Sequence, residues 1–336
     1  MNKTALAALA LGSSIASAQT GSSKPVPVTP DNFIRAETDM YFGIFAKRGG
    51  FGKFDHARDL PLGENTGVRP NRDTLYSLAV FDLDAGPVTI ALPDAGKRFM
   101  TMMVVDEDHY VSMVAYGKGT HTLDRKTIGT RYGFAALRVL VNPADPQDMK
   151  QAHALQDAVK VSQRSVGKLE TPNWDPASQK KVRDALLVLN ETLPDLRRAG
   201  GHRGEVDPVR HLIATASGWG LNPDKDAIYL NVTPVRNDGT TVYRLNVKDV
   251  PVDGFWSVTV YDERGLILKN SLDSYSLNNI TAKRGADGSV AIQFGGCDGK
   301  IPNCLPVRKG WNYMVRLYRP RAEILSGEWK FPEAQS

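Results

Sequence analysis

Residues 71–81 read Asn-Arg-Asp-Thr-Leu-Tyr-Ser-Leu-Ala-Val-Phe, a polar cluster that runs directly into an apolar segment. The alternation that follows Asp73 is typical of a β-strand. In extended backbone, Asn71 and Asp73 project to one face while Arg72 points away. Together with the phenol of Tyr76, such a pair could orient a substrate or hold a water as general base. The structural alternative is an Asx-turn, with the tyrosine hydroxyl satisfied locally.

The sequence on either side of this segment is rich in β-strand patterns. Apolar or alternating runs occupy 88–92, 98–105, 110–116 and 134–141, with turn signals between them. Short strands at regular spacing, without helices between them, favour an antiparallel sandwich over a wound α/β sheet. Residues 226–336 repeat this pattern, with 266–269 among the expected strands, and Asn237-Asp238-Gly239 predicts a tight hairpin. A second antiparallel sandwich is therefore expected.

Helical patterns separate and precede the two β-rich regions. Asp145-Pro146, Asp175-Pro176 and Asp207-Pro208 each place a carboxylate N-cap before a proline at the first helical position. One-sided apolar stripes follow each pair, so a helical bridge is predicted between the β-rich regions. Thr29-Pro30 predicts the start of an earlier helix, which ends at Gly49-Gly50.

The beginning of the chain has the features of a secretory signal. Lys3 supplies the positive charge, residues 5–11 form the apolar segment, and Ala16-Ser17-Ala18 is a cleavage site, which predicts a cut after Ala18. Residues 19–28 are expected to form a disordered leader. No later segment reaches the run of about 20 apolar residues that a membrane-spanning helix needs. The sequence therefore predicts a soluble protein in the periplasm or outside the cell.

Two further observations bear on compartment and partners. In an oxidising compartment, Cys297 and Cys304 favour a local disulfide over a metal pair, because no histidine or third cysteine lies nearby. The net charge of +5 is scattered along the chain, which argues against a nucleic-acid partner. The sequence contains no phosphate-binding glycine motif and no metal or cofactor signature, so none is expected. It also lacks the Gly-x-Ser-x-Gly motif of many serine hydrolases.

Several motifs resemble a pair of bacterial domain families. Residues 69–77 with 81–83 resemble the domain of unknown function 1254, and residues 254–262 with 316–320 resemble the domain of unknown function 1214. The resemblance covers nearly the whole mature chain in the expected order. It implies two jelly-roll-like β domains with a helical segment between them, and it supplies no activity.

The expected organisation is mainly β with a helical block. The expected boundaries are 1–18 for the signal peptide, 19–28 for the leader, 29–143 for an N-terminal helix with a 1254-like sandwich, 144–217 for the helical bridge, and 218–336 for a 1214-like sandwich.

Further candidate site residues come from other strands. His109 follows three acidic residues at the end of a strand, where it could act as an acid or base, although a solvated acidic turn is the competing interpretation. Arg316 lies between Val315 and Leu317, so it should face away from the core, where it could pair with an acid or clamp a carboxylate ligand. Trp256 and Tyr318 belong to the same strand-borne set.

Two hypotheses of function remain. The first is an exported hydrolase or lyase that acts on a small organic molecule in a cleft between the domains. Asp73 or His109 would then be the base, Tyr76 the proton donor and Arg316 the anion clamp, with Asn71, Arg72, Trp256 and Tyr318 contacting the ligand. The second is a non-catalytic ligand-binding or cell-envelope protein. A homo-oligomer formed through sheet edges fits either hypothesis.

Overall fold

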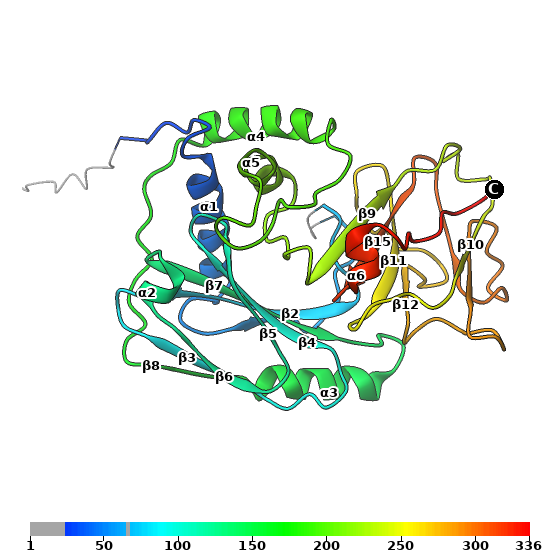
Figure 1. Cartoon of the computed structure of the whole chain (residues 1–336), viewed down its shortest axis with the longest axis horizontal. Helices are drawn as coiled ribbons and strands as arrows, with labels where there is room; N and C mark the ends of the chain where they lie inside the picture. Colours follow the sequence, from blue (N-terminus) through cyan, green and yellow to red (C-terminus); the bar gives the residue numbers. More distant parts are fainter. Residues whose placement is uncertain (1–23, 65–67) are drawn as a thin grey trace, which may run out of the picture.

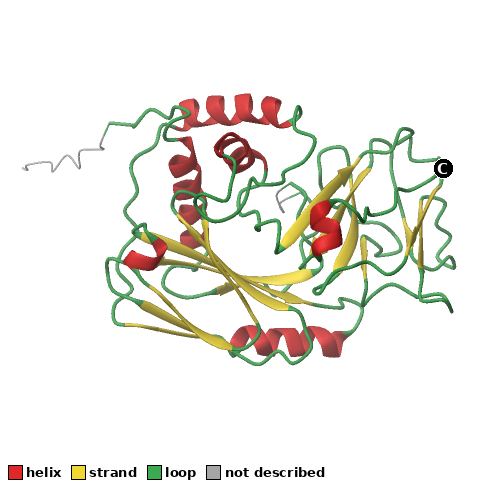
Figure 2. Ribbon diagram, viewed as in Figure 1, coloured by secondary structure: helices red, strands yellow, loops and turns green. Residues whose placement is uncertain are grey.

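The computed structural model describes residues 24–64 and 68–336, which form several antiparallel sheets and six helices (Figure 1; Figure 2). The predicted signal peptide and residues 19–23 of the leader lie outside these residues. The prediction of disorder is wrong for residues 24–28. The Val26 amide donates to the carbonyl of Asn173 at 2.7 Å, and Val28 is buried among helical side chains. Backbone pairing and apolar burial therefore order this segment.

The N-terminal β unit contains two sheets. The five-stranded sheet has the order β1-β2-β7-β4-β5, and the three-stranded sheet has the order β6-β3-β8; all their pairs are antiparallel. The strands are β1 (Asp55–His56), β2 (Thr74–Asp82), β3 (Val88–Leu92), β4 (Met100–Asp106), β5 (Val111–Tyr116), β6 (Gly119–Leu123), β7 (Tyr132–Leu140) and β8 (Lys160–Gln163).

Both faces of the five-stranded sheet are covered. Side chains such as Leu75 and Leu137 point into the main core, which also contains Ile90 of the three-stranded sheet. The opposite face carries Val80 and Phe134, which pack with helix α1 (Phe33–Lys47). Because side chains alternate along a strand, each central strand supplies one apolar set to the core and a second set to the other face.

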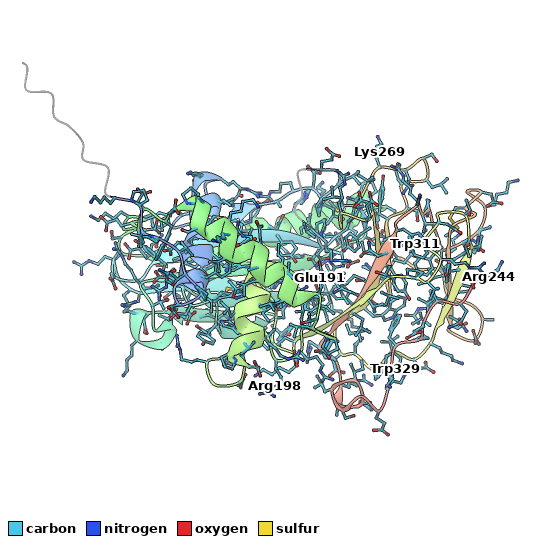
Figure 3. All side chains as sticks on the ribbon, turned by 90° about the horizontal axis from the view of Figure 1, so that it is seen from above. Glu191, Arg198, Arg244, Lys269, Trp311 and Trp329 are labelled. Atoms are coloured by element: carbon cyan, nitrogen blue, oxygen red, sulfur yellow. A yellow bond between two sulfur atoms is a disulfide. The ribbon has the colours of Figure 1, made fainter. Side chains whose placement is uncertain are left out.

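The C-terminal β unit also contains two sheets. A four-stranded sheet has the order β12-β11-β15-β9, and a three-stranded sheet has the order β10-β13-β14, in which only the β13–β14 pair is parallel. The strands are β9 (Ala227–Val232), β10 (Tyr243–Val247), β11 (Trp256–Tyr261), β12 (Ser276–Asn278), β13 (Val290–Phe294), β14 (Cys304–Leu305) and β15 (Asn312–Tyr318). Their shared core includes Trp311, which Figure 3 labels within this unit.

Of the four helices predicted from the sequence, three begin where predicted. In α3 (Pro146–Asp157), α4 (Pro176–Asn190) and α5 (Pro208–Ser217), the preceding aspartate accepts a backbone hydrogen bond from the first turn. The exception is α1, which begins at Phe33 instead of Thr29, because Thr29 and Asn32 form a turn before the helix. Short helices α2 (Arg125–Ile128) and α6 (Ala322–Ser326) complete the set.

Three expectations about connections are wrong. The region 144–217 is not wholly helical, because β8 lies within it and pairs with β3. The loop at 237–239 does not join paired strands, since β9 and β10 belong to different sheets. Residues 266–269 form no strand. Local patterns do not specify which strand pairs with which, and each error follows from that limit.

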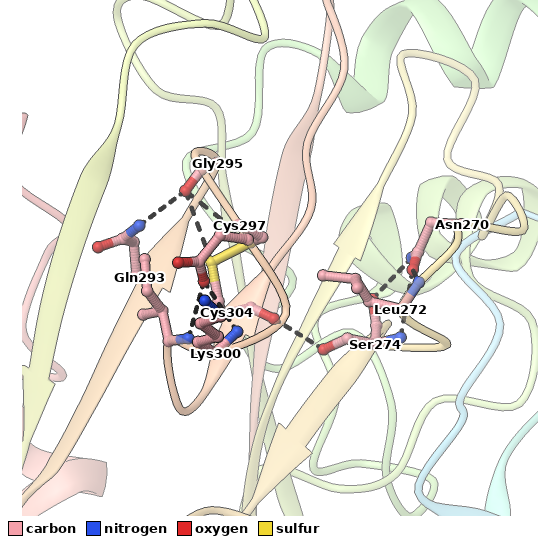
Figure 4. Close-up of a disulfide and its surroundings, with 10 residues drawn as sticks. Asn270, Leu272, Ser274, Gln293, Gly295, Cys297, Lys300 and Cys304 are labelled. Carbon is pink, nitrogen blue, oxygen red and sulfur yellow. Dashed lines mark hydrogen bonds between the residues drawn. A yellow bond between two sulfur atoms is a disulfide. The ribbon is translucent and has the colours of Figure 1, made fainter.

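The remaining structural predictions concern the disulfide and the membrane. Cys297 and Cys304 form the predicted disulfide beside the C-terminal sheet (Figure 4). The hydroxyl of Ser274 donates to the carbonyl of Cys304 at 2.8 Å, which ties the closed loop to the segment before β12. Within residues 24–64 and 68–336, none of the helices has the length and hydropathy needed to cross a membrane.

Candidate functional site

A cavity of about 470 Å³ lies between the two β units. Its first wall is the outer face of the five-stranded sheet, from β2, β4 and β7, and its second wall is the outer face of β9 and β15. The rest of the lining comes from helix α1, from the segment before β2 that carries Arg69 and Asn71, from α4, from Leu196, and from residues 217–221 at and after the end of α5. Figure 1 shows α1, α4 and α5 on one side of the five-stranded sheet and α3 on the other.

Tyr76 and Arg138 form the polar centre of the first wall. They lie directly opposite each other on β2 and β7, so both side chains project from the same face. The Nε of Arg138 donates to the Tyr76 hydroxyl at 3.1 Å, and its guanidinium carbon lies 5.1 Å from the centroid of that ring. The pairing register, and not proximity in sequence, creates this contact.

Arg316 and Tyr229 occupy the equivalent place on the second wall. They are opposite each other on β15 and β9. Val315 and Leu317 point into the C-terminal core, so Arg316 faces the other side of the sheet as the sequence pattern predicted. The predicted alternative in which Arg316 forms an ion pair with an acidic residue is not observed among the described residues. The Nη2 of Arg316 donates to the Tyr261 hydroxyl at 2.8 Å and to the carbonyl of Arg69 at 3.0 Å.

Asn71 connects the two walls. Its Nδ2 lies 3.2 Å from the hydroxyl of Tyr76 and 3.0 Å from the hydroxyl of Tyr318, which belong to different β units. Its Oδ1 accepts a hydrogen bond from the Asp73 amide at 2.8 Å. The Asx-turn considered for this segment is therefore present, and it positions Asn71 between the two phenols.

Three of the four phenols that line the cavity, those of Tyr76, Tyr229 and Tyr318, accept hydrogen bonds and donate none to the described residues. The Tyr76 oxygen accepts from both Arg138 and Asn71. The Tyr318 oxygen accepts from Asn71, and the Tyr229 oxygen accepts from Asn222 at 2.7 Å. Each hydroxyl proton is consequently available to an acceptor in the cavity.

The charge of the cavity lining is positive. Three arginines but no acidic residue line it among the described residues. Arg138 is 5 % exposed and Arg316 is 3 % exposed, and no described carboxylate lies within 4.0 Å of a nitrogen of either guanidinium. Asp73 acts on Arg316 only from beyond that distance. Buried charges in proteins are usually paired. Two guanidiniums without a carboxylate partner beside one cavity therefore indicate a site for an anionic ligand.

The pKa values of Tyr76 and Tyr318 are shifted in opposite directions. Burial works to raise the pKa of Tyr76, but the positive charges of Arg138 and Arg316 and the two hydrogen bonds to its oxygen bring that pKa below its usual value. Burial, together with neighbouring Tyr229 and Tyr76, raises the pKa of Tyr318 well above its usual value. Titratable pairs whose pKa values are pushed apart are typical of acid–base sites.

The structure brings together four of the eight predicted site residues. Asn71, Tyr76, Arg316 and Tyr318 line the cavity. Asp73 lies outside the lining and is fully buried, with its Oδ1 accepting from Asn278 at 3.1 Å and its Oδ2 without a partner among the described residues. Burial raises the pKa of its carboxyl, against the lowering effect of Arg316.

His109 is buried outside the lining. Its Nδ1 hydrogen-bonds with Thr215 at 2.8 Å, and its Nε2 accepts from the Gly220 amide at 2.7 Å. Burial and the nearby His211 lower the pKa of His109 well below its usual value, so the ring is neutral. Its ring is stacked on Trp219 with the centroids 5.4 Å apart, so His109 reaches the cavity only through the 218–221 segment.

Arg72 and Trp256 also lie away from the cavity. Arg72 donates to the carbonyl of Pro61 at 2.8 Å, and its guanidinium carbon lies 4.6 Å from the ring centroid of Tyr275. Trp256 is buried in the C-terminal core. Arg72 does point away from the face of Asn71, as the alternation predicted.

Sequence reasoning did not select Arg138, Tyr229 or Trp219. Arg138 lies between Leu137 and Val139, which is the same pattern that singled out Arg316. That signal was available and would have found it. Tyr229 and Trp219 carried no comparable signal, because their role depends on which strands and loops meet across the cleft.

Comparison with protein-family models places this cleft in a known pair of domains. A model described as a protein of unknown function (DUF1254) matches residues 51–163, and one described as a protein of unknown function (DUF1214) matches residues 232–322. The chain is thus similar to both domains, with the DUF1254 match first and the DUF1214 match second. The DUF1254 match includes β2, β4 and β7 of the first cavity wall, and the DUF1214 match includes β15 of the second.

Solved structures with the same fold include two bacterial proteins. The VPA0106 protein from Vibrio parahaemolyticus matches with a TM-score of 0.68 and 19% identity over 90% of this chain and 97% of its own. An uncharacterised protein from Burkholderia cenocepacia matches with a TM-score of 0.51 and 11% identity over 90% of this chain and 86% of its own. At these identities the likeness shows the fold of the DUF1254–DUF1214 chain alone. The search of curated proteins finds no match.

Potential metal ligands were sought in the same part of the DUF1254–DUF1214 chain. Across residues 24–64 and 68–336, no group of three or more histidine, cysteine, aspartate or glutamate side chains is arranged to hold a metal ion. The polar groups that line the cavity are guanidinium, phenol, hydroxyl and amide groups.

Proposed function

We propose that this protein binds a small organic anion, best a carboxylate, in the cleft between its two domains, and that it acts on that ligand as a lyase. The observation that carries this proposal is the pair of buried guanidiniums, Arg138 and Arg316, which face the cavity from opposite sheets without a carboxylate partner within 4.0 Å among the described residues. A carboxylate between them would supply the missing negative charge and accept charge-assisted hydrogen bonds.

The hydroxyl protons of the cavity support the same ligand class. Tyr229 and Tyr318 each accept a hydrogen bond while donating none to the described residues, so the site offers donors and needs acceptors. A carboxylate has two oxygens that only accept. A neutral alcohol or a cation would leave the guanidiniums uncompensated.

The two phenols define a route for proton transfer. Tyr76, with its lowered pKa, is the base, and Tyr318, with its raised pKa, is the acid. In an elimination, the Tyr76 phenolate takes the proton from the carbon next to the carboxylate, and the electron pair of that C–H bond forms the new double bond. The leaving group departs from the next carbon with its own electron pair and receives the Tyr318 proton.

Elimination fits the lining better than hydrolysis through a serine. Ser217 lines the cavity, but its hydroxyl donates to Asn190 at 2.9 Å, and no histidine lines the cavity among the described residues. A serine nucleophile needs an adjacent base to activate it. The arginines would also stabilise the negative charge that builds up on the carboxylate during proton removal.

Two further expectations belong to this proposal. Export to the periplasm or the medium is supported by the signal-like residues 1–18 and by the disulfide, which persists in oxidising compartments. Jelly-roll topology is supported in each domain by two sheets that share one core. Assembly into a homo-oligomer stays a prediction.

The second candidate function is binding without turnover. It is favoured by one observation: the described lining contains no aspartate, glutamate, histidine or lysine, the side chains that most often remove protons. In such a protein, the phenols and guanidiniums would only recognise the anion.

Proton exchange in deuterated water tests the proposal without knowledge of the leaving group. The protein is mixed with a panel of short carboxylates, binding is measured by calorimetry, and loss of the proton signal next to the carboxylate is followed by NMR. We expect Arg138→Gln to weaken binding about 30-fold or more. We expect Tyr76→Phe to slow exchange by about 100-fold or more. The exchange rate should reach its plateau at a pH below the ordinary pKa of a tyrosine.

The control is Tyr110→Phe, which removes a phenol outside the cavity lining and should change neither quantity. Binding without any exchange would support the non-catalytic alternative. A panel in which no carboxylate binds would refute both the anion site and the lyase.

A further inference from the structure

One end of the cleft is lined by aromatic rings. Tyr41 and Phe45 come from α1, Phe134 from β7 and Trp219 from the segment after α5, and all four line the cavity. Tyr41 is stacked on Trp219 with centroids 4.6 Å apart, and Phe45 is stacked on Phe134 with centroids 4.9 Å apart. The centroids of Phe134 and Trp219 are 5.3 Å apart, so the four rings form one continuous surface.

This aromatic surface is held in place before any ligand arrives. The indole nitrogen of Trp219 donates to the Thr38 hydroxyl at 3.0 Å. On its other side, Trp219 stacks on the buried His109, whose Nε2 accepts from the Gly220 amide. A rigid apolar surface gains binding energy from a flat ligand without the cost of ordering side chains. The role of His109 is thus to position Trp219.

The polar and aromatic ends are separated along the strands. On β7, Arg138, Ala136 and Phe134 follow one another on the cavity face. Four residues of strand correspond to roughly 13 Å. The neighbouring lining residues Leu78 and Met103 are apolar, so the charge lies at one end of the cavity only.

The size of the cavity excludes the smallest anions as its natural occupant. A volume of about 470 Å³ lies within the range of sites that hold whole organic molecules. Acetate would satisfy the guanidiniums and leave the aromatic surface uncovered. A carboxyl group bonded directly to a ring covers less of the span than one carried on a short chain.

We infer that the ligand is an arylalkanoic acid, with its carboxylate between Arg138 and Arg316 and its ring against the surface formed by Tyr41, Phe45, Phe134 and Trp219. This inference names the ligand class of the proposed anion site and rests on that site. The chain between ring and carboxylate has two or three carbon atoms, which lets the ring reach the aromatic surface while the carbon next to the carboxylate lies beside Tyr76.

Calorimetry with four probes tests the inference. The probes are 3-phenylpropanoate, benzoate, butanoate and the neutral 3-phenylpropan-1-ol. We expect 3-phenylpropanoate to bind about tenfold tighter than either butanoate or benzoate, and the alcohol to bind about 100-fold more weakly.

Matched variants separate the two ends. Phe45→Leu should weaken 3-phenylpropanoate binding about tenfold and leave butanoate binding unchanged, whereas Arg138→Gln should weaken both. The control is Phe51→Leu, since Phe51 packs against the same apolar cluster without lining the cavity and should change neither affinity.

Each failure has a distinct meaning. Equal affinity for butanoate and 3-phenylpropanoate, or a Phe45→Leu variant with unchanged affinity, would overturn the aromatic assignment and leave the anion site intact. Absence of binding by all three carboxylates would overturn the anion site and this inference together.

Discussion

Two regions of the molecule bury charged groups, and they compensate the charge differently. Between α1 and α4, the Nε of Arg183 donates to Glu37 at 2.8 Å, and Glu37 is 1 % exposed. Gln179 donates to the same carboxylate at 2.9 Å. In the cleft, Arg138 and Arg316 are nearly as deeply buried as Glu37, but they face phenols instead of carboxylates. The Glu37 carboxylate is in contact with its counter-charge, whereas the two guanidiniums are not.

The difference separates a structural charge from a functional one. An ion pair whose hydrogen bonds are all made fixes how two helices pack, and its charge needs no further counter-charge. An unpaired buried guanidinium is costly, and folds retain it where a ligand supplies the counter-charge. The four predictions that follow measure this contrast, beginning with the largest expected effect.

Breaking the ion pair between α1 and α4 should cause the largest loss of stability. Glu37→Gln leaves Arg183 without its counter-charge, so we expect the free energy of unfolding to fall by about 3 kcal/mol. Chemical denaturation measures this loss. The matched control is Asp184→Asn on α4, the helix of Arg183, which breaks the exposed pair with Lys180 and should cost less than about 0.5 kcal/mol. Equal effects of the two variants would remove the structural half of the comparison.

The disulfide provides a reference that is remote from both regions. Its loop spans only seven residues in sequence, so replacing Cys297 and Cys304 by serine should lower the free energy of unfolding by about 2 kcal/mol. Carboxylate affinity, measured by calorimetry on the folded variant, should not change. A loss of affinity would mean that the cleft depends on this loop and that the two regions are not independent.

The third prediction concerns Asp39 of α1 and the pH dependence of the free energy of unfolding. Burial, opposed by a hydrogen bond from Trp174, raises the pKa of its carboxyl from 3.8 to about 6, with Arg35, Glu107 and Asp108 as the charged neighbours. The folded protein holds this proton more tightly than the unfolded chain. The resulting stability is therefore complete below about pH 3.8 and is lost as the pH rises to about 6.

Asp39→Asn removes that dependence. Relative to the parent, the variant should gain about 1–2 kcal/mol of unfolding free energy as the pH rises from about 4 to about 6, and the gain should stay constant above it. Denaturation curves at a series of pH values measure it, with Asp59→Asn, at an exposed position, as the flat control. A parallel shift at every pH would show that the asparagine acts through packing instead.

The cleft should tolerate the loss of an arginine. Arg138→Met removes an unpaired buried charge, and the recovered desolvation offsets the lost hydrogen bond to Tyr76, so the free energy of unfolding should change by less than about 1 kcal/mol. Thermal and chemical denaturation both measure it. A loss as large as that of Glu37→Gln would make Arg138 a structural residue and end the contrast between the two regions.

Much of the fold could be predicted from local patterns. The aspartate–proline pairs mark the starts of α3, α4 and α5, because a carboxylate N-cap followed by proline acts within a single turn. Alternation around Arg316 gave the face on which it lies. The wrong hairpin at 237–239 and the missing strand β8 show the limit, since strand pairing depends on partners far away in the chain.

For the site as well, the sequence could select candidate residues but could not predict which of them lie together. Asn71, Tyr76, Arg316 and Tyr318 could be selected as candidates because polar or aromatic residues stood out within apolar strands. Which of the candidates meet could not be predicted. Asp73 and His109 look as reactive as Tyr76 in sequence, yet folding buries both behind the lining.

The sequence by itself determined the starts of α3, α4 and α5, the alternating faces of the central strands, the two cysteines that pair and the resemblance to the two domains, because each depends on residues close together in the chain. Only the tertiary structure decided that Tyr76 lies opposite Arg138, that Tyr229 lies opposite Arg316, and that Asn71 joins the two walls. Those contacts come from strand register and from the meeting of two sheets, which no short segment encodes.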